Sequence, residues 1–196
     1  MTYSAAWASM LQGNILESER IAQETLEKAQ KNNAVGAQAW AFLVQTFLAI
    51  QASQWQRAQQ CSDNALTIAR MLRDLDLQAR ILWGRSILAG WLNDWEMAIG
   101  EITEALRLSQ QYDNSSMVYP HFLLQAAQAH LQANHLDEAQ RYLDQGMRLS
   151  QERQYRQLPA VGKRIQGSIL RARGEYALAQ TYFEQSLNEL AALKDN

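Results

Sequence analysis

The segment "NDWEMAIGEITEALRLS", residues 93 to 109, has four related copies along the chain. The copies are "GNILESERIAQETLEKA" from residue 13, "SQWQRAQQCSDNALTIA" from 53, "NHLDEAQRYLDQGMRLS" from 134 and "GEYALAQTYFEQSLNEL" from 174. Successive copies start 40, 40, 41 and 40 residues apart. A fixed period of this length is typical of a repeat protein, in which each repeat packs against its neighbours.

Each copy predicts a helix that carries a stripe of small residues. Near the start of each copy stands a large apolar residue, and a small residue follows three positions later: Ser18, Ala58, Ala98, Ala139 and Ala179. A second small residue stands seven positions further on: Thr25, Ala65, Ala105, Gly146 and Ser186. Residues at this spacing share one helical face, so the stripe predicts close contact between helices. Polar residues such as Ser53, Asn93 and Asn134 suit a tight turn into the helix.

A second helical run lies between the copies. It begins near residues 34, 76, 117 and 157, and it has its own small residues at Ala6, Thr46, Ser86, Ala127 and Gly167. Pro120 and Pro159 fall near the start of two such runs, where a proline costs no intrahelical hydrogen bond. The repeating unit is therefore helix, turn, helix, and the predicted fold class is all-α.

Composition excludes several classes of protein. The chain has 196 residues and a net charge of −2, which favours neither nucleic acid nor a membrane surface as partner. A single cysteine, Cys61, excludes an internal disulfide and fits a reducing compartment. No apolar run approaches the roughly 20 residues that span a bilayer, and the first residues lack the pattern of a signal peptide. We expect a cytoplasmic protein.

The pattern resembles the tetratricopeptide repeat (TPR) family. The resemblance is carried by "RARGEYALAQTYFEQSL", residues 171 to 187, and "LNDWEMAIGEITEAL", residues 92 to 106. The period near 40 exceeds the family's usual 34 or so, and the proline that commonly closes each repeat is missing. The longer repeats are similar to arrays in bacterial signalling ATPases and MalT-like transcriptional regulators. The resemblance implies a single right-handed superhelical array over 1–196, with about ten helices in antiparallel pairs. The predicted repeats are 1–32, 33–73, 74–113, 114–154 and 155–196.

The resemblance also implies a binding groove lined by the first helix of each repeat. Its residues would be Trp7, Trp40, Leu43, Phe47, Ile50, Arg80, Trp83, Ile87 and Trp91 in the first half, and His121, Leu124, Gln128, Arg164, Ser168 and Arg171 in the second. The first half is aromatic and apolar, whereas the second is basic. Segment 141–173 holds eight basic residues against two acidic ones. Two alternatives stay open: the tryptophans can simply pack between repeats, and the basic residues can be a solvated surface.

No catalytic constellation is apparent. His121, His130 and His135 are nine and five residues apart, spacings that do not place two imidazoles on one helical face as metal ligands. Cys61 lies on the stripe of small residues, where a buried thiol is inert. No phosphate-binding glycine loop or nucleophile motif occurs. We therefore expect no enzymatic activity, no cofactor and no metal.

The predicted function is non-catalytic binding of a protein or peptide in the groove, as part of a larger bacterial regulatory or signalling protein. The alternative is a ligand-sensing domain that controls an attached ATPase or DNA-binding domain. The chain stops at "LAALKDN" without a polar helix to cover the last repeat. Solenoids normally carry such a cap, so we expect either a segment of a longer regulator or a homodimer.

Overall fold

The computed structural model describes residues 5, 9, 13–112 and 117–194, and these residues form helices and short turns without a strand. The helices are α2 (Ile15–Lys31), α3 (Val35–Gln51), α4 (Trp55–Met71), α5 (Leu75–Trp91), α6 (Trp95–Tyr112), α7 (Tyr119–Gln132), α8 (Leu136–Glu152), α9 (Leu158–Ala172) and α10 (Tyr176–Lys194). The all-α class is confirmed. Helices α2, α4, α6, α8 and α10 begin at the large apolar residue that opens each copy of the repeated segment.

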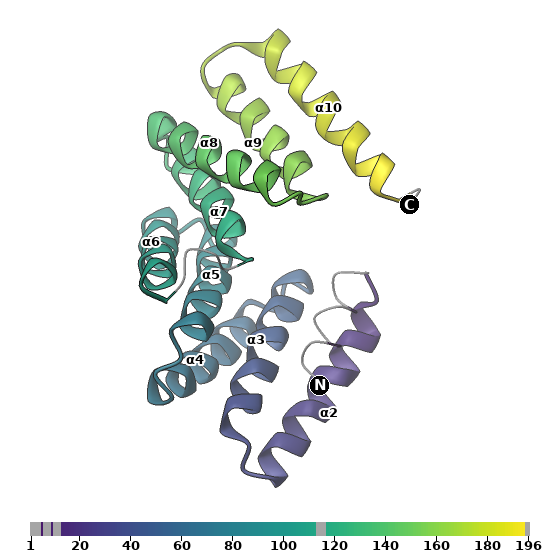
Figure 1. The fold of residues 1–196 in the computed structure, drawn as a ribbon, viewed down its shortest axis with the longest axis vertical. Coiled ribbons are helices and arrows are strands. Elements are labelled where there is room, and N and C mark those ends of the chain that lie inside the picture. The colour runs from purple at the N-terminus through teal and green to yellow at the C-terminus, as the bar shows by residue number, and fades with distance from the viewer. Residues whose placement is uncertain (1–4, 6–8, 10–12, 113–116, 195–196) are drawn as a thin grey trace. The chain divides into compact units, whose positions relative to one another are not determined.

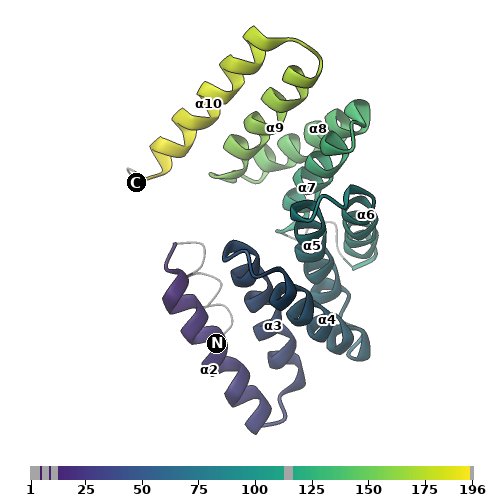
Figure 2. The same ribbon diagram turned by 180° about the vertical axis from the view of Figure 1, so that it is seen from behind.

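The chain divides into two compact units, unit 1 (Met1–Leu92) and unit 2 (Asn93–Asn196). The boundary falls in the turn between α5 and α6, inside the predicted third repeat. Within each unit, consecutive helices such as α3 and α4, or α9 and α10, pack against each other and run in opposite directions (Figures 1 and 2). The division into five repeats stays a prediction.

Most helices end in a left-handed residue, and these residues set the period. Positive φ angles of 51° to 83° occur at Gly13, Asn33, Ser53, Arg73, Asn93, Asn134, Gln154 and Gly174. Neighbours in this series are 20 residues apart, except for the pair of Asn93 and Asn134. A helix of 17 residues, such as α3, followed by a three-residue turn gives 20. Two such elements account for the 40-residue repeat.

Paired hydrogen bonds close these turns. The amide of Asn33 donates to the carbonyl of Gln30 at 3.2 Å, and the amide of Ala34 donates to the carbonyl of Ala29 at 2.8 Å. The same two bonds recur around Ser53, Arg73, Asn134, Gln154 and Gly174. This is the Schellman motif, which satisfies the last carbonyls of a helix when the next residue is left-handed. The following helix starts at once, which makes the two helices antiparallel.

Small residues let these helices approach closely. Ser18, Ala58, Ala98, Ala139 and Ala179 are all at most 2% exposed, as the stripe predicted. A Cβ added to Gly146 on α8 would lie 2.9 Å from Leu124 Cδ2 on α7. A Cβ added to Gly167 on α9 would lie 2.8 Å from Phe183 Cε1 on α10. Contacts this short leave no room for a larger side chain.

Both prolines lie near the start of a helix, as the sequence predicts. Pro120 and Pro159 lie in the first turns of α7 and α9. Their missing N–H groups would have no intrahelical acceptor in that turn, so neither proline disturbs its helix.

Alanine at Gly174 should lower the free energy of unfolding by about 1 kcal/mol, because a Cβ disfavours the left-handed backbone that glycine adopts freely. No atom lies within 4 Å of the added Cβ, so the change isolates the backbone term. Gly100 in α6 is the matched control, since the space around its added Cβ is equally open. Gly100→Ala should raise the free energy of unfolding by about 0.5 to 1 kcal/mol. Urea unfolding followed by circular dichroism measures both, and shifts of the same sign would contradict this account of the turn.

Candidate functional site on the first helices

In unit 1 the predicted site residues lie on α3 and α5, which pack against each other. The guanidinium carbon of Arg80 lies 5.5 Å from the centroid of the Trp40 ring. Arg80 Nε also donates to Asp76 Oδ2 at 2.7 Å, and the side chains of this ion pair are 24% and 23% exposed. The Arg80 guanidinium is therefore held in place by the Trp40 ring and the Asp76 carboxylate, and the carboxylate partly neutralises its charge.

Aromatic rings continue this surface of unit 1. Phe47 and Trp83 contact each other with ring centroids 5.0 Å apart. Trp91 stacks on Trp55 at 6.1 Å and is 64% exposed. Trp55 opens α4, so Trp91 belongs to the corner between a first and a second helix. Ile87 is half-buried. Aromatic surface that stays accessible is suited to an apolar partner.

Burial corrects four of the groove positions. Leu43 is 0% exposed, Ile50 7% and Leu124 3%, so these side chains belong to the cores of their units and offer no surface to a partner. Helix α3 packs against α2, α4 and α5, and a helix covered on several sides buries more than one stripe of apolar residues. Phe47 is also buried, at 8%, and its ring meets the half-buried Trp83. Trp7 lies outside the described residues.

In unit 2 the structure brings Arg171 and Ser168 together at a cavity of about 250 Å³ between α7 and α9. Leu131, Gln132 and Ala172 complete the described lining. Sequence reasoning missed Gln132, although it follows Gln128 by four residues and so lies on the same face of α7. Ser168 Oγ donates to the carbonyl of Arg164 at 3.0 Å within α9.

The basic segment divides into paired and unpaired cations. Lys163 Nζ lies 2.6 Å from Glu189 Oε1, and Arg173 lies 3.3 Å from Asp137. Arg164 and Arg171 are exposed, and in the described part of the chain no carboxylate lies within 4 Å of either guanidinium. These two arginines therefore carry the uncompensated charge of the first-helix surface in unit 2.

Two further predicted residues lie on α7. The His121 ring meets the Tyr155 ring edge to face, with centroids 5.6 Å apart. Gln128 is half-buried, and its Oε1 atom is buried without a hydrogen-bond partner among the described residues. A buried amide oxygen without a donor is costly, so Gln128 would gain from a ligand that donates a hydrogen bond to it.

Two histidines lie side by side in the structure, although their spacing in the sequence does not place them on one helical face. The rings of His130, in the last turn of α7, and His135, in the turn before α8, have centroids 5.6 Å apart. The His130 ring also stacks on Tyr142 at 5.3 Å. Spacing along one helix could not reveal this pair, because a turn brings the two rings together.

Burial lowers the pKa of His130 below its ordinary 6.5, and the nearby positive charges of His135 and Arg141 lower it further, whereas the carboxylate of Glu138 raises it.

No group of three potential ligands that could hold a metal ion occurs among the described residues. Cys61 is buried, and burial raises the pKa of its thiol, as expected for an inert cysteine. Within the same described residues, no helix is both long and apolar enough to cross a membrane.

No family model matches the chain, and no curated protein matches it. Solved structures do resemble it. BtubC from P. vanneervenii has a TM-score of 0.74 at 18% identity, over 97% of this chain and 79% of that one. A Rap protein in complex with Competence and Sporulation Factor has a TM-score of 0.78 at 12% identity, over 99% of this chain and 64% of that one. Nearly identical TPR-like repeats from Podosopora anserina give 0.68 at 11% identity, over 100% and 95%. The likeness shows the fold: the chain is a TPR-type repeat structure.

Acidification should weaken the fold through His130. Because the folded state lowers the pKa of His130, the unfolded chain binds a proton on this residue more readily than the folded chain does. The stabilisation is therefore present above pH 6.5 and is lost as the pH falls from there toward the folded pKa. His130→Gln should remove this part of the pH dependence. Urea midpoints between about pH 8 and about pH 5 would measure it. An unchanged pH profile for His130→Gln would contradict the assignment.

Proposed function

We propose that this chain is a non-catalytic interaction module that binds a peptide or protein segment on the first helices of its two units. The observation that carries the proposal is the cavity between α7 and α9, where Arg171 has no described carboxylate within 4 Å. Such an arginine is suited to an acidic side chain of a partner. In unit 1, the half-buried Trp40 and Trp83 suit apolar side chains.

The comparisons support this proposal at the level of the fold. A Rap protein that shares the fold forms a complex with Competence and Sporulation Factor. A helical-repeat fold can therefore hold a second molecule, and in this chain Trp40, Trp83, Arg164 and Arg171 lie on first helices. The predicted ligand segment combines apolar and acidic residues.

Selection from a random peptide library on phage tests this prediction. Wild-type protein should enrich peptides that carry both apolar and acidic residues. Trp83→Ala and Arg164→Glu should each weaken binding of an enriched peptide by about tenfold or more, and the double variant should abolish it, because truncated aromatic and arginine anchors typically cost more than 1 kcal/mol. Helicity should stay unchanged in circular dichroism.

The matched control for the charge reversal is Arg148→Glu. Arg148 lies on the second helix α8, its side chain is 70% exposed, and it makes a weak 4.0 Å contact with Glu152. This variant should bind the selected peptides nearly as wild type does. Retained binding by the Trp83→Ala and Arg164→Glu double variant would refute the placement of the site.

We also propose that the outer stripe of α10, formed by Tyr176, Leu187 and Leu190, packs against a second copy of the chain. Leu187 is 66% exposed, whereas the matching Leu26, Leu66 and Leu106 are 6% to 8% exposed. Each of those leucines lies on a second helix that packs against the first helix of the next repeat. The stripe residues, with Gln180 between them, are uncharged, so two copies can meet without bringing like charges together.

Sedimentation over a wide concentration range tests the homodimer. Wild type should sediment as a dimer, and Leu187→Glu should be monomeric because it places a charge in the apolar contact. Leu178→Glu is the control, since Leu178 is 53% exposed on the same helix and, nine residues from Leu187, faces the opposite side. It should remain dimeric. A wild-type chain that is monomeric at every concentration would refute this interface without affecting the peptide site.

A further inference from the structure

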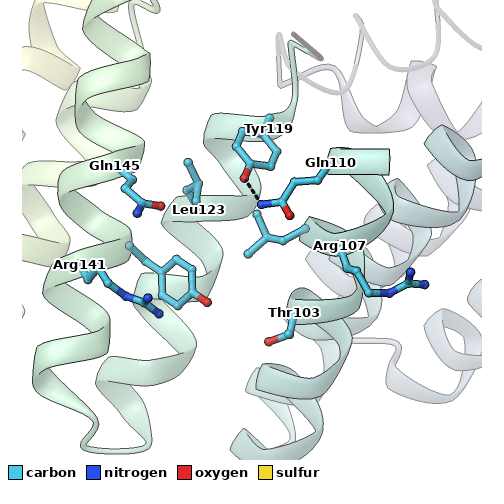
Figure 3. A pocket seen from close by; sticks show the side chains of 9 residues that line it. Thr103, Arg107, Gln110, Tyr119, Leu123, Arg141 and Gln145 are labelled. Atoms are coloured by element: carbon cyan, nitrogen blue, oxygen red, sulfur yellow. Dashed lines mark hydrogen bonds between the residues drawn. The ribbon is translucent and has the colours of Figure 1, made fainter. Parts of the chain in front are cut away.

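Unit 2 contains a second cavity, of about 300 Å³, on the side of its second helices. Leu106 of α6 and Leu123 of α7 contribute apolar, buried side chains, and Tyr119 and Tyr142 contribute aromatic rings (Figure 3). Arg141 and Gln145 of α8 lie at one side of it. The cavity is distinct from the surface proposed above. At 100° per residue along α7, Tyr119 and Leu123 point away from the face that carries His121 and Gln128.

In unit 1 an ion pair joins two second helices. There, Arg57 Nη1 of α4 lies 2.8 Å from Glu19 Oε1 of α2 and joins two successive second helices. The matching positions in unit 2 are Glu138 on α8 and Ile99 on α6, which cannot form an ion pair. Helices α6 and α8 therefore lack this bridge, and the cavity lies about one turn further along, at Thr103 of α6 and Arg141 of α8.

Arg141 supplies an uncompensated cation to this cavity. Its guanidinium carbon lies 4.9 Å from the centroid of the Tyr142 ring, and in the described part of the chain no carboxylate lies within 4 Å of it. Stacking on a ring satisfies the face of a guanidinium and leaves its N–H edge able to bind an acceptor. The Tyr142 ring is itself held by stacking on His130.

The remaining polar groups add donors. Gln110 Nε2 donates to the Tyr119 hydroxyl oxygen at 3.0 Å, which leaves the hydroxyl proton of Tyr119 available for an acceptor (Figure 3). None of the described lining residues is acidic. Arg107 also lines the cavity, but Glu104 accepts hydrogen bonds from its Nε and Nη2, each at 2.6 Å. Arg141 is thus the cation that remains to bind a ligand.

We propose that this cavity binds an oxyanion carried on a short apolar stem. The oxyanion would accept from Arg141 and Tyr119, and the stem would lie against Leu106 and Leu123. Two sources share this chemistry, namely a carboxylate at a side chain or chain end and a phosphoryl group on a side chain. Either anion would form charge-assisted hydrogen bonds with the Arg141 guanidinium, which already lies against the Tyr142 ring, and such bonds are stronger than those between neutral groups.

Nuclear magnetic resonance titration of the full chain tests this site with three small probes. The probes are N-acetyl-glutamate amide, its phosphoserine counterpart and the neutral N-acetyl-glutamine amide. Both anionic probes should shift the resonances of residues around the cavity, and the glutamine probe should bind about tenfold more weakly or not at all, because it lacks the charge. The tighter of the two anionic probes identifies the source of the oxyanion.

Substitutions then locate the binding group. Arg141→Gln should weaken the anionic probes by about tenfold, and Tyr119→Phe by severalfold, because each removes a donor. Arg148→Gln is the control, since Arg148 lies seven residues further along α8 and does not line the cavity. It should bind as wild type. Absence of shifts with both anionic probes, equal binding of the glutamine probe, or equal weakening by Arg148→Gln would overturn the proposal. None of these results depends on the first-helix surface, so the two sites are tested separately.

Discussion

The left-handed residue that ends most of the described helices is the constraint on which the rest of the structure depends. It lets the amides of two successive residues satisfy the last carbonyls of a helix while the chain reverses direction. Consecutive helices then lie antiparallel and close together, so each interface needs small residues such as Ala58 and Gly146. Helix length, repeat period and the stripe of small residues are therefore linked by the geometry of this turn.

Burial in this architecture divides first-helix residues into core and surface. A first helix such as α3 touches three other helices, which leaves a narrow accessible strip. Trp40 and Trp83 keep part of their surface, whereas Leu43 has none.

Charge is distributed by the same geometry. Ion pairs between neighbouring helices, such as Lys163 with Glu189, neutralise part of the basic segment, although the sequence shows an excess of positive charge throughout it. Four arginines of this segment, Arg141, Arg156, Arg164 and Arg171, are exposed and have no described carboxylate within 4 Å. Arg141 and Arg171 line separate cavities, one on each side of unit 2. Local pairing, more than net charge, decides which surface can attract an anion.

The sequence by itself determined the helices, their turns, their starting residues and the buried stripe, because these follow from 3.6-residue periodicity and from turn chemistry within a few residues of each site. The seven-residue spacing of Arg164 and Arg171 also placed these two arginines on one helical face. Only the tertiary structure decided which apolar residues are core, that a turn brings His130 to His135, and that unit 2 lacks the bridge formed by Arg57 and Glu19 in unit 1. Such contacts join residues that are far apart in the chain or separated by a turn, and their distances depend on how helices pack, which periodicity does not specify.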